Sequence, residues 1–488
     1  MRFDSFHFLV FFSLVCAIFW SIPNRFRWLL LLVSSYYFYM CWEPPYALLL
    51  LASTVIDFTV GLLLGRVADP KVRRRLIVPS LAANLGFLFY FKYYDFFART
   101  INQCWGTPLL SPIPFLLPAG ISFYTFQTLS YTLDVYWKEQ EPERHFGRFA
   151  NFVAFFPHLV AGPIMRAGAL IPQLRNFQEF EYQRVTDGLK LMGWGLFKKV
   201  VIADRLARLV DPIYSDVNNA SGLGLMLATV AFGYQIYCDF SGYSDMAIGA
   251  AQVLGVNLIQ NFRAPYHSRS LREFWTRWHI SLSTWFRDYV YIPLGGNHVS
   301  RLRWSWNILV VFGLSGLWHG ANWTYIFWGL YHGILLILGR STERFWKRAY
   351  ELTGIARVGA LARAIDVVAT FATVSGGWIL FRSQSLADAW LIINKISLEL
   401  ISQIDSPIRE LQTLLYICYQ YLSSVDTFVV LAAIAVLEIG DVVQDRIAFR
   451  PWLARRPAAI RWAWYCALVF VVIVWGQFNG PPFIYFQF

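Results

Sequence analysis

His319 is the residue of this chain whose surroundings most suggest chemistry, because one ionisable imidazole lies between two apolar stretches of unequal length. The stretch before it, residues 307–317, is about half a bilayer span, and the stretch after it, residues 323–338, is nearly a full one. A short apolar run is more typical of a re-entrant or broken helix than of a crossing. Backbone freedom for such a break could come from Gly313, Gly316 and Gly320. We therefore expect His319 at membrane depth, where an ionisable group is a functional candidate. The alternative is a structural histidine hydrogen-bonded to a carbonyl.

The signatures of several common chemistries are missing. No GxSxG elbow, HExxH motif or phosphate-binding P-loop occurs, and the eight histidines show no metal-ligand spacing. The six cysteines form no CxxC pair, which argues against a disulfide framework or a cysteine metal site. A histidine without a nucleophile of its own is suited to general-base activation of a hydroxyl that the substrate brings. Acyl transfer from an activated thioester to such a hydroxyl would fit.

A second histidine, His279, lies in a stretch of aromatic and basic residues, 268–291. The apolar residues recur at helical spacing, so we expect one amphipathic helix over 271–289 with His279 at the edge of its apolar face. Arginines are distributed around the other side: Arg269, Arg272, Arg277 and Arg287. One interpretation is an interfacial anchor helix with snorkelling arginines. The other is a helix at the cytoplasmic mouth of a cavity, whose arginines receive a phosphate-bearing donor while His279 faces the reaction chamber.

Other polar residues in apolar surroundings are expected to be structural. Asp239 and Asp245 lie in an apolar run, and a buried carboxylate needs partners, so we expect them to pair with arginines of 269–287 rather than to catalyse. His158 could relay protons, but a histidine that forms a hydrogen bond at a helix end is the preferred interpretation.

The composition identifies the kind of element that must position these residues. Of the 488 residues, 57% are hydrophobic and only 15% are charged, and the mean hydropathy is +0.44. We predict an all-α polytopic membrane protein of about 10–13 transmembrane and re-entrant segments. Clear or probable spans are 6–22, 28–42, 46–65, 76–97, 223–254, 323–338, 365–380, 427–439 and 462–476. Shorter or more polar candidates are 115–135, 149–164, 189–203 and 307–317.

The net charge of +12 would suggest nucleic acid in a soluble protein, but here the basic residues lie in short loops between spans. This is the positive-inside pattern, so no nucleic-acid partner is expected. It places loops 66–75 and 440–461 in the cytoplasm and the N-terminus and the C-terminal PPFIYFQF outside. The first apolar run has no small-residue cleavage site after it and is taken as a retained span. We expect a multi-pass protein of the inner, cytoplasmic membrane, surrounded by lipid.

The chain shows no internal repeat and no long linker, which favours a single integral domain over 1–488. Residues 1–110 are simple hydrophobic hairpins, and residues 339–488 are plain spans with a more polar connection at about 383–416. Residues 113–338 mix glycine, proline and charged residues with apolar ones, which indicates broken or flat-lying helices. Broken helices line cavities in membrane proteins, so the catalytic centre is expected within 113–338.

At these motifs the chain closely resembles the membrane-bound O-acyltransferase family. Within it, the likeness is greatest to the bacterial branch of alginate O-acetyltransferases and the related D-alanyl and peptidoglycan acyltransferases. The matching blocks are PAGISFYTFQTLSYTLDVY (118–136), FFPHLVAGPI (155–164), QIYCDFSGYSDMAIG (235–249), NFRAPYHSRSLREFWTRWHISLSTWFRDYVYIPLGGN (261–297), LSGLWHGANWTYIFWGLYHG (314–333) and the terminal FIYFQF (483–488).

The resemblance implies a ring of helices around a thin central funnel, with the donor entering from the cytoplasm and the acyl group leaving towards a partner outside. The family's catalytic histidine corresponds to His319, and the second histidine of the family corresponds to His279, whose role as catalytic, donor-positioning or structural residue stays open. No block identifies the polymer, because relatives that act on alginate, cellulose or peptidoglycan would have similar sequences in these blocks.

Together these features predict an O-acetyltransferase for an alginate-like exopolysaccharide that uses acetyl-CoA or a related thioester. A periplasmic partner protein or the polymer itself would accept the acetyl group. His319 would act as general base or as transient acyl carrier, and Arg269, Arg272 and Arg277 would hold the donor's phosphates. The alternatives are a D-alanyl or peptidoglycan acyltransferase and, from another class, a polysaccharide or proton-linked transporter with His319 as relay.

Overall fold

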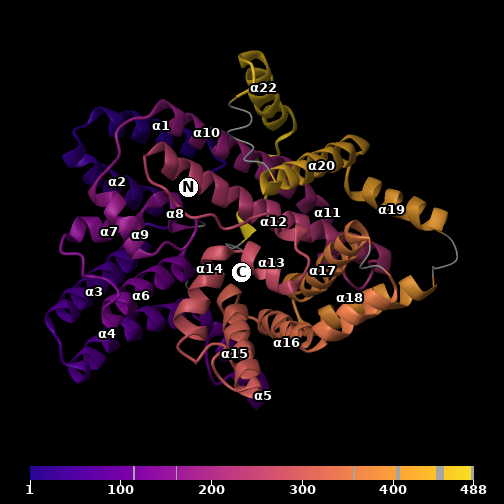
Figure 1. Cartoon of the computed structure of the whole chain (residues 1–488), viewed down its shortest axis with the longest axis horizontal. Helices are drawn as coiled ribbons and strands as arrows, with labels where there is room; N and C mark the ends of the chain where they lie inside the picture. Colours follow the sequence, from indigo (N-terminus) through magenta and orange to yellow (C-terminus); the bar gives the residue numbers. More distant parts are fainter. Residues whose placement is uncertain (114–115, 161, 355–357, 403–406, 447–454, 485–488) are drawn as a thin grey trace. The chain divides into compact units, whose positions relative to one another are not determined.

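The computed structural model describes the chain except residues 114–115, 161, 355–357, 403–406, 447–454 and 485–488. The described part is helical and contains no strand (Figure 1), which confirms the all-α prediction. The elements, with π- and 3₁₀-helices labelled η, are α1 (Phe6–Ser21), α2 (Asn24–Met40), α3 (Tyr46–Arg66), α4 (Pro70–Leu88), η1 (Phe89–Tyr93), α5 (Tyr94–Trp105), α6 (Ile121–Trp137), α7 (Phe146–Ala154), α8 (Phe156–Leu159), α9 (Ala167–Arg175), α10 (Tyr182–Phe197), η2 (Lys198–Ala203), α11 (Asp204–Ser215), α12 (Gly222–Val253), η3 (Pro265–His267), α13 (Leu271–Arg277), α14 (Ile280–Phe286), η4 (Arg287–Tyr291), α15 (Arg301–His319), α16 (Trp323–Leu352), α17 (Gly359–Arg382), α18 (Leu386–Ser402), α19 (Pro407–Tyr421), α20 (Ser424–Arg446) and α22 (Ala458–Trp475).

Several helices are long and apolar enough to cross a membrane, which confirms a polytopic membrane protein. Among the described residues there are five, or six if a pair of helices bent by 107° forms one span. The other expected membrane segments lie in helices that are shorter, broken or, like the 30-residue α16, less continuously apolar. The five are Tyr46–Arg66, Pro70–Trp105, Gly222–Val253, Gly359–Arg382 and Ala458–Trp475, and the bent pair is Gln412–Tyr421 with Ser424–Val443.

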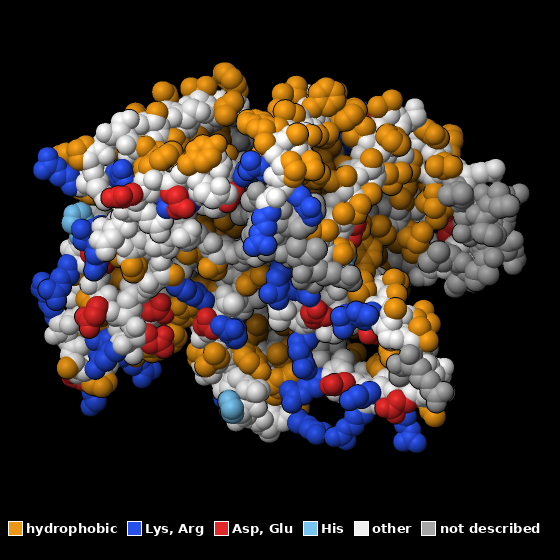
Figure 2. All heavy atoms as spheres, turned by 45° about the horizontal axis from the view of Figure 1, so that its top comes forward, with side chains coloured by type: hydrophobic (Ala, Val, Ile, Leu, Met, Phe, Trp, Pro, Cys, Tyr) orange, Lys and Arg blue, Asp and Glu red, His pale blue; other side chains and the backbone are white. Residues whose placement is uncertain are grey.

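Large apolar side chains lie on the surface, as lipid contact requires. In α22, Trp462 and Ile473 are 65% and 67% exposed, although water would penalise both. Figure 2 shows hydrophobic side chains over much of the visible surface, with lysines and arginines gathered in separate areas. This distribution is expected for helices whose outer faces meet hydrocarbon.

The contacts divide the chain into two compact units. The first contains residues 1–193 and 243–260, and the second contains residues 194–242 and 261–488. Helices α10 and α12 each contribute to both units. The single domain over 1–488 stays a prediction.

The core of the first unit is built around the buried carboxylate of Asp57, on α3. Asn84 Nδ2 donates to both of its oxygens at 3.0 and 2.9 Å, Ser80 Oγ donates at 2.5 Å, and Thr132 Oγ1 donates at 3.3 Å. These partners lie on α4 and α6. Because a buried carboxylate is stable only when it accepts hydrogen bonds, the cluster fixes the three helices to one another.

Arg73 shows that the basic segment at 66–75 is not a simple loop. The sequence predicted a cytoplasmic loop there, whereas α4 begins at Pro70 and Arg73 is buried. Its guanidinium donates to the carbonyls of Val67, Val135 and Tyr136 at 2.8, 2.6 and 2.9 Å, and also to that of Leu64. These carbonyls lie at or just after the C-terminal ends of α3 and α6, where helices leave carbonyls without intrahelical donors.

The polar connection expected at 383–416 is helical in the structure. Its described residues form helix α18 and most of α19, and Lys395 of α18 donates to the carbonyls of Val217, Asn218 and Ala220. The connection is therefore helical, and α18 is not among the helices long and apolar enough to cross a membrane.

Candidate active site

His319 is the last residue of α15, and α16 begins four residues later at Trp323. The predicted break is therefore confirmed, although α15 starts at Arg301 and is longer than the apolar run suggested. Asn322 caps α16, since its side chain accepts a hydrogen bond from the Thr324 amide at 3.2 Å. The partial negative charge at the C-terminal end of α15 favours a cation there, so it would stabilise the imidazolium that forms when His319 takes a proton.

The glycines around His319 provide space rather than unusual dihedral angles. Gly313 and Gly316 lie inside α15, and Gly320 has an extended φ of −164°. A Cβ on Gly316 would lie 2.2 Å from the Tyr325 carbonyl oxygen, and one on Gly320 would lie 2.2 Å from the Tyr325 ring. The expectation of backbone freedom at all three positions was thus wrong. At Gly316 and Gly320 the small residue allows α15 and α16 to pack closely.

Aromatic rings enclose the imidazole of His319. Its ring centroid is 4.9 Å from that of Trp328, 5.0 Å from that of Trp318 and 5.5 Å from that of Phe381. The side chain is almost completely buried, with 2% of its surface exposed. Such a site excludes water, which strengthens the electrostatic interactions of any charge that forms in it.

The helix predicted over 271–289 is broken at His279. Helix α13 ends at Arg277 and α14 begins at Ile280, and the segment finishes in η4. His279 has φ 42° and ψ 56°, the left-handed region that is unusual for a residue with a side chain. The prediction of one continuous helix was wrong because the aromatic residues keep helical spacing across the break. A backbone held in this region is a feature of functional sites more often than of ordinary helices.

Asn261 holds the turn at His279. Its carbonyl oxygen accepts the amide of Ile280 at 2.9 Å, and its Oδ1 accepts the hydroxyl of Ser281 at 2.6 Å. On the other side of the turn, the amide of Arg263 donates to the carbonyl of Arg277 at 3.0 Å. These bonds connect both ends of the break to residues 261–263, so they offset the strain of the left-handed residue.

The structure brings the two predicted histidines together. The ring centroids of His279 and His319 are 6.2 Å apart, and Trp318 lies beside both, 5.7 Å from His279. Phe240 of α12 packs against His279 at 4.6 Å between ring centroids. Two buried imidazoles at this separation can act on one small reacting group, one as proton acceptor and the other by orienting it.

The predicted donor-binding arginines lie on or beside α13. Arg269 and Arg272 are exposed, whereas Arg277 is partly buried and forms an ion pair with Glu273 at 2.9 Å. The structure therefore leaves Arg269 and Arg272 accessible to an anionic ligand. The guanidinium of Arg277 is already engaged by a carboxylate.

Two other expectations are now resolved by their contacts. Asp239 forms an ion pair with Lys199 at 2.8 Å, so the expected pairing with an arginine of 269–287 was wrong for this residue. His158, in the first unit, forms a hydrogen bond of 2.8 Å with Gln127 Oε1, as the structural interpretation expects.

His332 is a site residue that the sequence reasoning missed. It is fully buried one layer behind Trp328, with 5.2 Å between the two ring centroids. Among the described residues, neither of its ring nitrogens has a hydrogen-bond partner. Its signal was weak because a histidine inside an apolar helix is more often structural. Its position, 13 residues after His319 on the next helix, brings it close only through the packing of α16 against α15.

Comparison with known proteins places both histidines in a matched segment. Residues 143–382 match the model of the membrane-bound O-acyltransferase family. The chain is 39% identical over 395 residues to a probable alginate O-acetylase, AlgI, of Pseudomonas aeruginosa, covering 80% of this chain and 74% of the relative. It is 34% identical over 389 residues to a peptidoglycan O-acetyltransferase of Helicobacter pylori, covering 74% and 72%.

A more distant relative is a teichoic acid D-alanyltransferase of Bacillus subtilis, 29% identical over 275 residues, or 54% of this chain and 68% of the relative. The proteins named here share acyl transfer and differ in the polymer and the acyl group. Matches of this length and identity, together with the two buried histidines inside the matched segment, lead to one conclusion. The chain belongs to the membrane-bound O-acyltransferase family and is a multi-pass membrane O-acyltransferase.

Proposed function

We propose that this protein O-acetylates an extracytoplasmic, alginate-like polysaccharide from the inner membrane, with acetyl-CoA or a related cytoplasmic thioester as donor. The observation that carries the proposal is the buried pair His279 and His319 in a chain 39% identical to an alginate O-acetylase. A periplasmic partner protein, or the polymer directly, would receive the acetyl group.

In the proposed reaction, His319 acts as general base. Its imidazole takes the proton of the acceptor hydroxyl while the hydroxyl oxygen bonds to the thioester carbonyl carbon. The carbon–sulfur bond then breaks, and the leaving thiolate takes the proton back from the imidazolium. The products are an acetyl ester and a free thiol, so no further reactant is needed. The aromatic enclosure of His319 would keep water from hydrolysing the thioester.

A second candidate is transfer to peptidoglycan, which the 34% identical relative of Helicobacter pylori supports. A test separates the candidates in cells that lack the gene and carry either the wild-type protein or His319→Ala. Acetate released by mild base is measured from the exopolysaccharide and from peptidoglycan, and D-alanyl esters are measured in the envelope. The proposal expects ester loss in the exopolysaccharide alone; loss confined to peptidoglycan would contradict it.

Arg272 on α13 and Arg269 just before it are exposed and are proposed to hold the donor's phosphates. Arg272→Ala would remove one charge-assisted contact of about 1.5–3 kcal/mol, which raises the KM for the donor by about 10- to 100-fold with a smaller effect on kcat. Steady-state kinetics in proteoliposomes measure both constants. Arg301→Ala, at another exposed arginine at the start of α15, is the matched control and should leave the KM unchanged. An unchanged KM in the Arg272 variant would remove this arginine from the donor site.

A further inference from the structure

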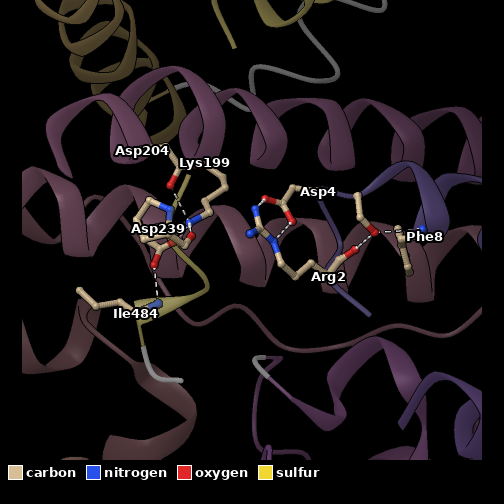
Figure 3. Close-up of polar contacts among 9 residues, drawn as sticks. Arg2, Asp4, Phe8, Lys199, Asp204, Asp239 and Ile484 are labelled. Carbon is tan, nitrogen blue, oxygen red and sulfur yellow. Dashed lines mark hydrogen bonds and ion pairs between the residues drawn. The ribbon is translucent and has the colours of Figure 1, made fainter. Parts of the chain in front are cut away.

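Three charged side chains of the second unit form a buried cluster that the proposed reaction does not use. Lys199 Nζ lies 2.7 Å from Asp204 Oδ1 and 2.8 Å from Asp239 Oδ1. The three side chains are 1%, 1% and 5% exposed. They come from η2, from the start of α11 and from α12, and Figure 3 shows Lys199 placed between the two carboxylates.

The end of the chain completes this cluster. The carbonyl oxygen of Pro481 accepts a hydrogen bond from Lys199 Nζ at 3.1 Å, and the amide of Ile484 donates to Asp239 Oδ2 at 2.7 Å, as Figure 3 shows for the latter. Gly480 passes directly over Asp204, because a Cβ at this position would lie 2.3 Å from Asp204 Cγ. The segment 480–484 is therefore held by backbone contacts at three points.

The charges explain why the segment and the cluster depend on each other. Two carboxylates share one ammonium group, and a buried carboxylate needs further donors to replace its lost hydration. The Ile484 amide supplies one to Asp239. Loss of the segment would leave the cluster with fewer partners, and loss of the cluster would release the segment.

Neighbouring residues connect this cluster to the histidines. Phe240 follows Asp239 on α12, and Phe483 precedes Ile484, so two adjacent residues of α12 contact two adjacent residues of the C-terminal segment. Phe483 is fully buried, and its ring centroid is 5.6 Å from that of Phe240. Phe240 in turn packs on His279 at 4.6 Å.

We propose that Lys199, Asp204 and Asp239 are positioning residues for acyl transfer, which anchor segment 480–484 so that Phe483 supports His279 through Phe240. The inference rests on the proposed function, because it assigns the segment a role in the reaction at His279 and His319. The role is indirect: these residues hold an imidazole in place and do not contact the reacting atoms.

The test is a comparison of Phe483→Ala with Phe478→Ala in the purified full-length protein in proteoliposomes, with acetyl-CoA as donor. Phe478 lies just before segment 480–484 and is 46% exposed, so it is a matched control. A small misplacement of His279 should lower kcat by about 10-fold in the Phe483 variant, with the donor KM within about twofold of the wild type. The Phe478 variant should match the wild type in both constants.

Two further variants separate positioning from folding. Ile484→Pro removes the amide hydrogen that Asp239 accepts, and should show the same loss of kcat at unchanged KM. If Phe483 acts through Phe240, the effects of replacing the two residues should not be additive. In a Phe240→Leu background, Phe483→Ala should therefore lower kcat by less than about threefold. Phe483→Leu keeps most of the side-chain volume and should accumulate normally with an intermediate kcat.

Wild-type kcat in both Phe483→Leu and Ile484→Pro would overturn the proposal. The proposal would also be overturned if the variants accumulate to a lower level but keep the wild-type kcat per folded molecule. The segment would then have a structural role alone. If the wild type and Phe478→Ala fail to transfer acetyl to any acceptor hydroxyl, the proposed function fails instead, and the two failures are distinguishable.

Discussion

Replacement of His319 by alanine is expected to lower polymer acetylation by at least about 10²-fold, a typical contribution of a general base. The physical reason is that the acceptor hydroxyl then has no group to take its proton as it attacks the thioester. The membrane insertion of the variant should stay nearly unchanged. The measurement is the rate of ester formation per folded protein, with the thermal midpoint in detergent recorded alongside.

The packing of His319 determines the controls. Because its ring contacts Trp318, Trp328 and Phe381, alanine leaves a cavity, so His319→Gln is the better matched variant: it fills most of the space and cannot act as a base near neutral pH. His298→Ala, at an exposed position of the same unit, should retain full activity. Normal acetylation by His319→Gln at a normal protein level would exclude the proposed mechanism.

The second large effect is expected at His279. His279→Asn should lower kcat by about 10²-fold, because asparagine lacks a titratable imidazole. Asparagine tolerates the left-handed backbone at this position, so the thermal midpoint should stay close to that of the wild type. The measurement is kcat and the donor KM in proteoliposomes, together with the unfolding midpoint.

His279→Ala provides the comparison for backbone strain. Alanine is less suited to φ 42° than asparagine, so we expect His279→Ala to be less stable than His279→Asn by about 1 kcal/mol. Its loss of kcat should be similar to that of His279→Asn. His298→Asn is the control for the amino-acid change itself. If His279→Asn transfers acetyl at the wild-type rate and only His279→Ala is impaired, the residue serves the turn and not the chemistry.

The sequence alone determined the class of protein and the location of the main candidate. A chain that is 57% hydrophobic must satisfy its backbone hydrogen bonds inside lipid, and helices do so within one segment, so an all-α membrane protein followed. The break after His319 was also predicted, because the apolar run before it is only about half a bilayer span. The sequence blocks that resemble the family identified His319 and His279 as candidate residues.

The tertiary structure decided how these residues are held. The helical spacing of Trp275, Trp278 and Leu282 continues through the break at His279, so no local pattern marked it. The break is maintained by Asn261, which contacts Ile280 and Ser281 from a separate segment. Trp328 and His332 are neighbours at positions i and i+4 of α16, but only the packing of α16 on α15 brings Trp328 against His319.

The same reason explains the partner of Asp239. A carboxylate in an apolar run indicates only that it needs a cation or a hydrogen-bond donor as partner. Several arginines in the sequence could have been that partner. Which one it meets depends on contacts between distant segments: Lys199 lies 40 positions away, and the Ile484 amide lies 245 positions away. Local periodicity carries no information about such pairs, because their energy comes from the exclusion of water when the segments pack together.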